Sequence, residues 1–379
     1  MLLLGTALPL TVAEPAQAAS CWGQKPTAAA RVTTPQWSQQ WLDPARLHRI
    51  STGGTVRVAV LDSGVDRSHP QLRGAVEQGW DVVTNEPNGT VDCVGHGTAV
   101  ASLIAARRDG DAALVGVAPT ARIVPIRVSE NGSGASSYRD VTPDRLAAGI
   151  RRAITLKADV IHVSFAVSTN AAVLRNAVAD AVRRQIVVVA AVGDKVPGAT
   201  YPAAYPGVLG VGAAEPSGLR WADSGAGTHL DLMAPGVGLI AAARVGGHIS
   251  IGGTAAAAAL VSGSAALVRA SQPKWTVSQV TARLLATADG TPGGSHSKTY
   301  GYGSVNPYRA LTEPIGSPEP SPSPNPVPAA AMNLPHQPGL PAPVRRALLW
   351  AGGIGLATAL LVGTYAAAVA IRHRRRQRA

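Results

Sequence analysis

The 379-residue sequence is poor in aromatic residues, which make up 4% of the chain and include a single phenylalanine. No basic patch is interleaved with aromatic side chains, so we do not expect nucleic acid as a partner. The chain also lacks clusters of histidine, cysteine and carboxylate residues at metal-ligand spacing, and we expect neither a metal nor a cofactor. Calcium sites built from loop carbonyls leave little trace in a sequence and stay open.

Acidic residues are also scarce, and the net charge is +12. Seven of the positive charges are arginines at 345–346 and 372–378, which flank a C-terminal apolar run and leave +5 for the rest of the chain. The basic excess therefore belongs mainly to the chain's C-terminal end.

Residues 347–371 form a run of 25 residues without a charge, which is long enough to span a bilayer. The arginine-rich tail, 372–379, is expected in the cytoplasm by the positive-inside rule. The main domain would then lie outside the cell membrane, on a single-pass protein. The alternative is a buried C-terminal helix, which would need a partner to cover every face.

The two ends of the folded region also show recognisable composition. Residues 1–18 are largely apolar and end in Ala-Gln-Ala, which fits an export signal with its cleavage site, although a short buried segment is the alternative. Residues 19–54 are polar and rich in tryptophan, as in an arm laid over a domain. The proline-rich segment 313–346 predicts an extended, semi-rigid linker.

Cysteine is nearly absent, with only Cys21 and Cys93. In an exported chain the two are expected to pair, because oxidising compartments preserve disulfides. Closing so long a loop would contribute about 4 kcal/mol to stability by the chain-entropy model. Two free thiols are the alternative.

Between residues 55 and 312, strand-like and helix-like segments alternate at βαβ spacing. This pattern predicts an α/β fold with a doubly wound parallel sheet. Strands are expected at 55–61, 115–128, 158–163, 186–191 and 238–251, and helices at 99–107, 142–156, 171–184 and from 254 onward.

Several short motifs in this region together resemble subtilisin-like serine proteases of the S8 family. Residues 58–66 (VAVLDSGVD) resemble the aspartate motif of that family and residues 95–101 (GHGTAVA) its histidine motif. Their order, before the helix at 254, is the subtilisin order. The further matches are 116–119 (GVAP), 201–206 (YPAAYP), 234–236 (APG) and 301–303 (GYG). The resemblance implies a subtilisin-like three-layer fold.

The wider organisation resembles the mycosins, the membrane-anchored subtilisin-like proteases of type VII secretion systems. The shared features are an export signal, a cysteine before the histidine motif, a proline-rich linker and one C-terminal membrane helix. The resemblance implies type VII membrane components as partners and a peptide or protein ligand. One departure is visible, because the chain has no second cysteine pair.

The resemblance assigns Asp62 and His96 to two members of a catalytic triad. In such a triad the aspartate orients the imidazole, which takes a proton from a serine hydroxyl and returns it to the leaving amine. The alternative is structural, with Asp62 as a turn residue and His96 as a helix cap.

The third member of the triad is missing. Aligned with the family's Gly-Thr-Ser pattern, the nucleophile position falls on Ala255, and a methyl group cannot attack a carbonyl carbon. The family's proline falls on Ala259. Ser262 and Ser264 lie about 10 Å further along the helix, at 1.5 Å per residue, and do not reach His96 if residue 255 sits at the nucleophile position.

Two further positions depart from the family pattern. Asp194 stands where the family carries an oxyanion-binding asparagine, and an ionised carboxylate donates no hydrogen bond. Ser164, Phe165 and Ala166 stand where subtilisins usually carry Ser-x-Gly, the edge that pairs with an extended peptide. A simple strand end is the alternative for these three residues.

Together these features favour a catalytically inactive, mycosin-like pseudoprotease with a binding or scaffolding role. The enzyme alternative is an active serine endopeptidase, or an engineered serine-to-alanine form of one. Three separate departures, at 194, 255 and 259, favour natural loss over a designed single change. A plain structural domain without a ligand groove is the third alternative.

Overall fold

The computed structural model describes residues 28–130, 141–290 and 296–314. The predicted export signal, Cys21, nearly all of the linker, the predicted membrane helix at 347–371 and the basic tail lie outside the described residues.

A seven-stranded sheet with the order β2-β3-β1-β4-β5-β6-β7 forms the centre of the fold. Every neighbouring pair of its strands is parallel, which confirms the predicted α/β fold with a parallel sheet. The strands are β1 (Arg57–Asp62), β2 (Trp80–Asp81), β3 (Arg122–Arg127), β4 (Val160–Val163), β5 (Val187–Ala191), β6 (Val208–Ala214) and β7 (Leu232–Pro235).

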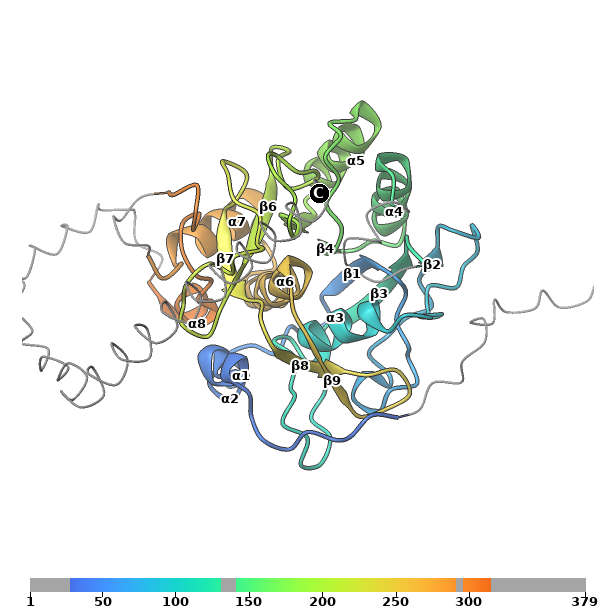
Figure 1. Ribbon diagram of the computed structural model, residues 1–379, viewed down its shortest axis with the longest axis vertical. Helices are drawn as coiled ribbons and strands as arrows, with labels where there is room; N and C mark the ends of the chain where they lie inside the picture. Colours follow the sequence, from blue (N-terminus) through green and yellow to red (C-terminus); the bar gives the residue numbers. More distant parts are fainter. Residues whose placement is uncertain (1–27, 131–140, 291–295, 315–379) are drawn as a thin grey trace, which may run out of the picture. The chain divides into compact units, whose positions relative to one another are not determined.

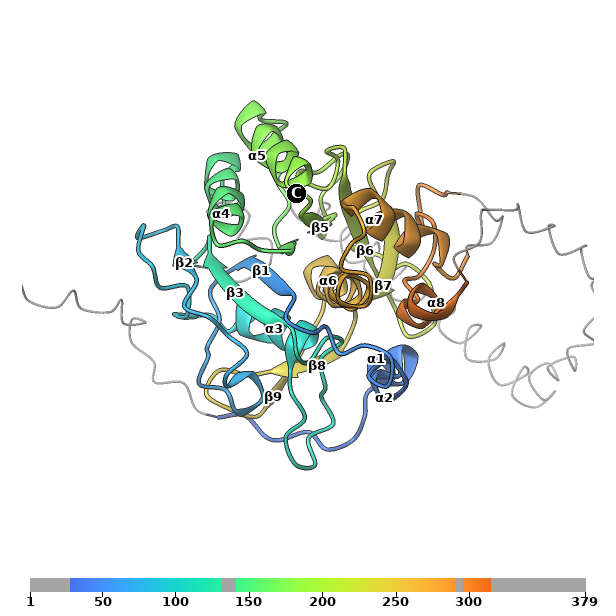
Figure 2. The same cartoon turned by 180° about the vertical axis from the view of Figure 1, so that it is seen from behind.

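Helices cover both faces of this sheet. In Figure 1, α4 (Pro143–Thr155) and α5 (Ala172–Arg183) lie on one side, and α3 (His96–Ala105) and α6 (Thr254–Ser271) on the other; Figure 2 shows the same layers from behind. Alternate residues of β1 point into separate apolar clusters, so the sheet divides two cores. Both faces are covered, and the strands are accordingly almost continuously apolar.

The remaining helices are short, and most lie on the α6 side of the sheet. One of them, α7, begins with a capping box formed by Thr276 and Gln279. These elements are α1 (Trp37–Leu42), α2 (Pro44–Leu47), the 3-10 helix η1 (Pro70–Leu72), α7 (Val277–Ala286) and α8 (Pro307–Thr312).

Two of the predicted strands were wrong. The run 115–128 forms a strand only from Arg122, because its first half passes through a turn containing a glycine and a proline. The run 238–251 is an antiparallel hairpin of β8 (Leu239–Ala242) and β9 (His248–Ile251), with paired glycines in the turn between them. Apolar composition alone did not show where either run turns.

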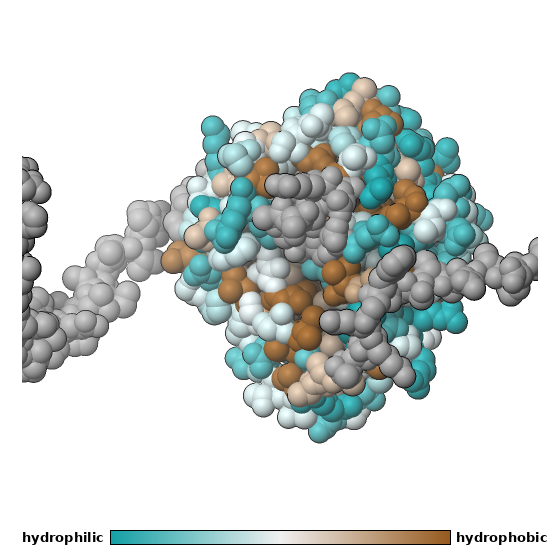
Figure 3. All heavy atoms as spheres, turned by 45° about the vertical axis from the view of Figure 1, so that its right-hand side comes forward, coloured by the Kyte–Doolittle hydropathy of each residue, from teal (hydrophilic) through white to brown (hydrophobic). Residues whose placement is uncertain are grey.

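The helix α6 is buried along most of its length, as its almost uncharged sequence predicts. Within the described ranges it is the one helix long and apolar enough to cross a membrane, but 83% of that stretch is buried inside the domain. It is therefore a core helix. On the surface, apolar residues interrupt the hydrophilic area in patches (Figure 3).

Candidate active site

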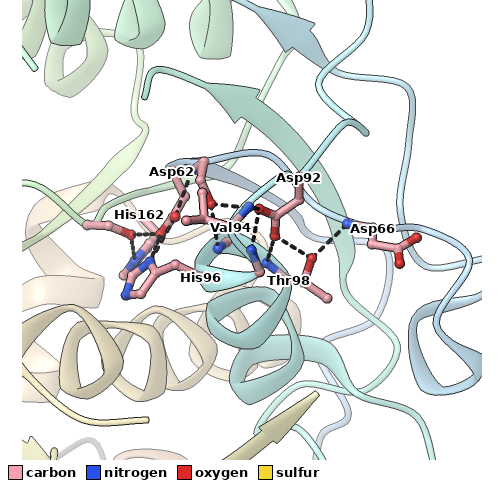
Figure 4. A network of polar contacts seen from close by, with 11 residues as sticks. Asp62, Asp66, Asp92, Val94, His96, Thr98 and His162 are labelled. Carbon is pink, nitrogen blue, oxygen red and sulfur yellow. Dashed lines mark hydrogen bonds and ion pairs between the residues drawn. The ribbon is translucent and has the colours of Figure 1, made fainter. Parts of the chain in front are cut away.

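The carboxyl end of β1 and the first turn of α3 bring Asp62 and His96 together. Nδ1 of His96 lies 2.8 Å from Oδ1 and 2.9 Å from Oδ2 of Asp62. The side chain of Asp62 is fully buried, whereas that of His96 keeps 11% of its surface exposed. Figure 4 shows this pair within a polar network that also contains Asp92, Thr98 and His162. The two residues that sequence motifs assigned to a triad are thus in the contact that those roles require.

The electrostatics of this pair favour an ionised aspartate beside a charged imidazole. Burial acts to raise the pKa of Asp62, but the charge of His96 and hydrogen bonds from His96, Ser164 and Ser63 outweigh it, and the pKa is lowered. Burial likewise acts to lower the pKa of His96, but the charge and hydrogen bond of Asp62, with smaller contributions from Asp92 and Asp194, raise it. Asp62 therefore favours the charged form of His96.

A second buried carboxylate, Asp92, positions the start of α3. It accepts hydrogen bonds from the amides of Gly95 and Thr98 and from the hydroxyls of Ser63 and Thr98. The Ser63 hydroxyl also accepts a bond from the amide of Gly97. Sequence reasoning missed this residue, although an acidic side chain just before a helix is a recognisable capping signal.

His162 is a further residue that sequence reasoning missed. It lies on β4 and is fully buried, with Nε2 2.9 Å from the hydroxyl of Ser164 and Nδ1 3.1 Å from the hydroxyl of Ser262 on α6. Ser164 in turn donates a hydrogen bond to Asp62. Burial lowers the pKa of His162 to about 4, so it is neutral at pH 7. Because Ser262 is 100 residues away in the chain, no local pattern could reveal this network.

The first turn of α6 contains Ala255, the predicted nucleophile position. Ala255 is 2% exposed and presents a methyl group there. The helix is preceded by Gly253, whose φ of 108° is one that residues with a side chain rarely adopt. A Cβ at this position would also lie 2.4 Å from Oδ2 of Asp194. The glycine is therefore required for the helix to begin against that carboxylate.

Asp194 follows the end of β5 and caps α6 from outside the helix. Its Oδ1 accepts hydrogen bonds from the amide of Thr254 at 2.9 Å and from the hydroxyl of Thr254 at 2.7 Å. The same hydroxyl accepts a bond from the amide of Gly193. Thr254 directly precedes Ala255, so the carboxylate of Asp194 contacts the first turn of α6 next to the predicted nucleophile position.

Burial raises the pKa of Asp194, while the two bonds from Thr254 and the nearby charge of His96 act in the opposite direction. Asp194 and His96 attract each other, because each favours the charged form of its partner. The charge on the His96 imidazole is thus favoured by two carboxylates from different segments, Asp62 at the end of β1 and Asp194 after β5.

We expect the substitution Asp194→Ala to lower the free energy of unfolding by about 1–2 kcal/mol, because α6 loses its N-terminal cap. Asp194→Asn retains a carbonyl oxygen that can accept from Thr254, so its loss should be smaller. Denaturant unfolding of the two variants and the wild type measures both values. Equal stability of Asp194→Ala and the wild type would refute the capping role.

Ser164, Phe165 and Ala166, the predicted peptide-binding edge, follow β4, and their side chains are buried. The side chain of Ser164 is engaged with Asp62 and His162. The Cβ of Ala166 lies 3.0 Å from the position that a Cβ on Gly193 would take, so the two strand ends approach closely. Peptide binding at this edge stays a prediction.

Cys93 precedes α3 and is not a free thiol, and its carbonyl accepts a hydrogen bond from Arg244. Because Cys21 lies outside the described residues, the predicted Cys21–Cys93 pairing stays a prediction. Within the described ranges, no group of three histidine, cysteine or acidic residues is placed to hold a metal ion.

Comparison with known proteins supports the relationship that the motifs indicate. The model of the subtilase family matches residues 53–303. Subtilisin E of Bacillus subtilis is 40% identical over 261 residues, which are 67% of this chain and 65% of that protein, slightly less than two thirds of its length. Subtilisin of Bacillus pumilus is also 40% identical over 67% of this chain and 90% of its own length.

Solved structures give the same fold. The MycP3 protease from the type VII (ESX-3) secretion system is 31% identical, with a TM-score of 0.67 over 74% of this chain and 89% of its own. MycP1 from Mycobacterium smegmatis is 28% identical, with a TM-score of 0.67 over 78% of this chain and 90% of its own. The chain is thus mycosin-like and related to type VII secretion proteases. By its family match, its identities and the geometry of Asp62 and His96, this chain belongs to the subtilase family.

Proposed function

We propose that this chain is a catalytically inactive member of its family that binds or scaffolds within a type VII secretion complex. It would be anchored in the cell membrane by residues 347–371, with the subtilase domain outside. The observation that carries the proposal is the methyl group of Ala255 at the first turn of α6, where catalysis requires a hydroxyl.

The side chain at position 194 also supports this proposal. An oxyanion would need a hydrogen-bond donor at this position. Instead, Oδ1 of Asp194 accepts hydrogen bonds from the amide and the hydroxyl of Thr254. A second requirement of the reaction is therefore unmet on this interpretation.

The second candidate function is that of an active serine endopeptidase, and the preserved contact between Asp62 and His96 favours it. Such an enzyme would need a hydroxyl from another residue. The serines of α6 do not offer one, since Ser262 and Ser264 are fully buried and donate to backbone carbonyls one turn earlier.

Genetic complementation separates binding from catalysis. In a host strain that lacks the gene, we expect the wild-type chain and the His96→Ala variant to restore type VII secretion to the same level. A chain truncated after residue 346 should fail, because it lacks the predicted anchor. The measured quantity is secreted substrate per cell, with the amount of each variant checked by immunoblot.

A folded His96→Ala variant that restores no secretion would contradict the non-catalytic role. Full complementation by the truncated chain would instead contradict membrane anchoring, so the two parts of the proposal fail separately.

A further inference from the structure

The N-terminal arm, here residues 28–33, contacts the turn between β8 and β9 and the first residue of β9; Figure 1 shows this hairpin. The amide of Ala29 donates to the carbonyl of Gly246 at 2.9 Å, and the amide of His248 donates to the carbonyl of Ala30 at 2.9 Å. A third bond joins the arm to a side chain, since the amide of Val32 lies 2.9 Å from Nδ1 of His248. The arm is thus held partly by one imidazole nitrogen.

The proton positions on His248 are fixed by its partners. Its Nε2 lies 2.8 Å from Oε1 of Gln71, whose amide nitrogen donates to the carbonyls of Arg107 at 3.0 Å and Leu114 at 2.7 Å. The oxygen of Gln71 can therefore only accept, and Nε2 of His248 must carry the hydrogen. Because the amide of Val32 is a donor, Nδ1 must be bare, and the imidazole is neutral.

The proton positions on His69 are also fixed by its partners, one of which is the backbone amide of Gln71. The backbone amide of Gln71 donates to Nδ1 of His69 at 3.2 Å, and Nε2 of His69 lies 3.0 Å from the carbonyl of Gly247. The ring centroids of His69 and His248 are 6.3 Å apart. Both imidazoles must be neutral for every one of these hydrogen bonds to form.

The charges around the two rings come from several elements. Arg31 of the arm forms ion pairs with Asp109 at 3.0 Å and with Asp111 at 2.8 Å. Burial lowers the pKa of His248, the charges of His69 and Arg31 add to this, and Asp109 opposes it. Burial also lowers the pKa of His69, with Asp66 and Asp109 among the opposing groups.

We propose that His248 and His69 form an acid-sensitive latch, which holds the arm on the hairpin at neutral pH and releases it in acid. A proton that binds Nδ1 of His248 places an N–H group opposite the N–H of Val32. The bond between them is then lost and replaced by repulsion, and the buried ring gains a charge. Release of the arm removes the repulsion between the two N–H groups. It also gives the charged imidazolium access to water.

Hydrogen–deuterium exchange of the full-length chain tests the latch. After correction for intrinsic exchange rates, we expect residues 28–33 and 246–251 to be protected at pH 7.5 and to open at pH 5.0. Opening coupled to one proton should increase by up to about tenfold per pH unit below the pKa of the released histidine. Far-ultraviolet circular dichroism at pH 5.0 verifies that the domain remains folded.

The double variant His69→Gln, His248→Gln replaces both imidazoles with side chains that do not titrate, and we expect the acid dependence of opening to disappear. This holds whether glutamine keeps the arm closed or leaves it open at both pH values. In Val32→Pro the donor N–H is absent, so the arm should be open at both values. The matched control is His296→Gln, a histidine outside the latch, which should keep the wild-type acid dependence.

Three outcomes would overturn the latch. The first is equal protection of the wild-type arm at pH 7.5 and pH 5.0. The second is acid dependence in the double variant His69→Gln, His248→Gln as large as in the wild type. The third is loss of acid dependence in the His296→Gln control.

Discussion

After the double substitution Ala255→Ser and Asp194→Asn, the chain should react with a fluorophosphonate probe and cleave peptides, whereas the wild type should do neither. The first change supplies a hydroxyl at the nucleophile position, and the second supplies an amide that can donate to an oxyanion. Loss of the nucleophile from such a triad costs about 10⁶ in turnover, which sets the expected difference between wild type and double variant. Probe labelling on a gel and peptide turnover measure it.

The single variant Ala255→Ser separates the two defects. It should be slower than the double variant by about 10²–10³, the usual effect of losing one oxyanion donor. Adding His96→Ala to the double variant should abolish labelling, because the hydroxyl then lacks its general base. A wild-type chain that labels and cleaves, and loses both properties in His96→Ala, would overturn the proposal that the protein is inactive.

The second large effect concerns acid stability, and we expect the folded domain to lose about 2 kcal/mol between pH 7 and pH 5 through His162 alone. The pKa of His162 is about 4 in the folded state, against an ordinary value of 6.5 that represents the unfolded chain. The unfolded chain therefore binds more protons between these values. The stabilisation that depends on a neutral His162 is therefore fully present above pH 6.5, the pKa of the unfolded chain. It is lost as the pH falls toward 4, the pKa of the folded domain.

Denaturant unfolding at pH 7 and pH 5 measures this loss, and His162→Asn is the matched variant. Asparagine is neutral at both values and retains a polar side chain beside the hydroxyl of Ser164. Between pH 7 and pH 5 the free energy of unfolding of this variant should therefore fall by about 2 kcal/mol less than that of the wild type. An equal decline in both proteins would show that the fold does not lower the pKa of His162.

The parallel sheet and the pairing of Asp62 with His96 could be predicted from the sequence, because each rests on a local pattern. The run ending at Asp62 is β-branched and apolar, and the motif around His96 opens an alanine-rich helix. The absence of a hydroxyl at Ala255 is likewise visible in register with the family motif. Each of these predictions depends only on residues that are close together in the sequence.

The rest of the site depends on contacts between distant segments. Asp194 could be recognised as a replaced asparagine, but its role as a cap required the position of Thr254, which is 60 residues away. The links of His162 to α6 and of His248 to the arm join residues 100 and 216 apart. Side-chain hydrogen bonds over such separations result from packing, which periodicity and propensity do not encode.

The cap that Asp194 provides has a consequence for how the proposed inactivity could be reversed. The same carboxylate that stabilises the helix start also opposes an oxyanion, so a serine regained at position 255 would meet an unfavourable partner. Full turnover would therefore require changes at both positions, and the side chain at position 194 would have to supply a donor while still accepting from the amide of Thr254.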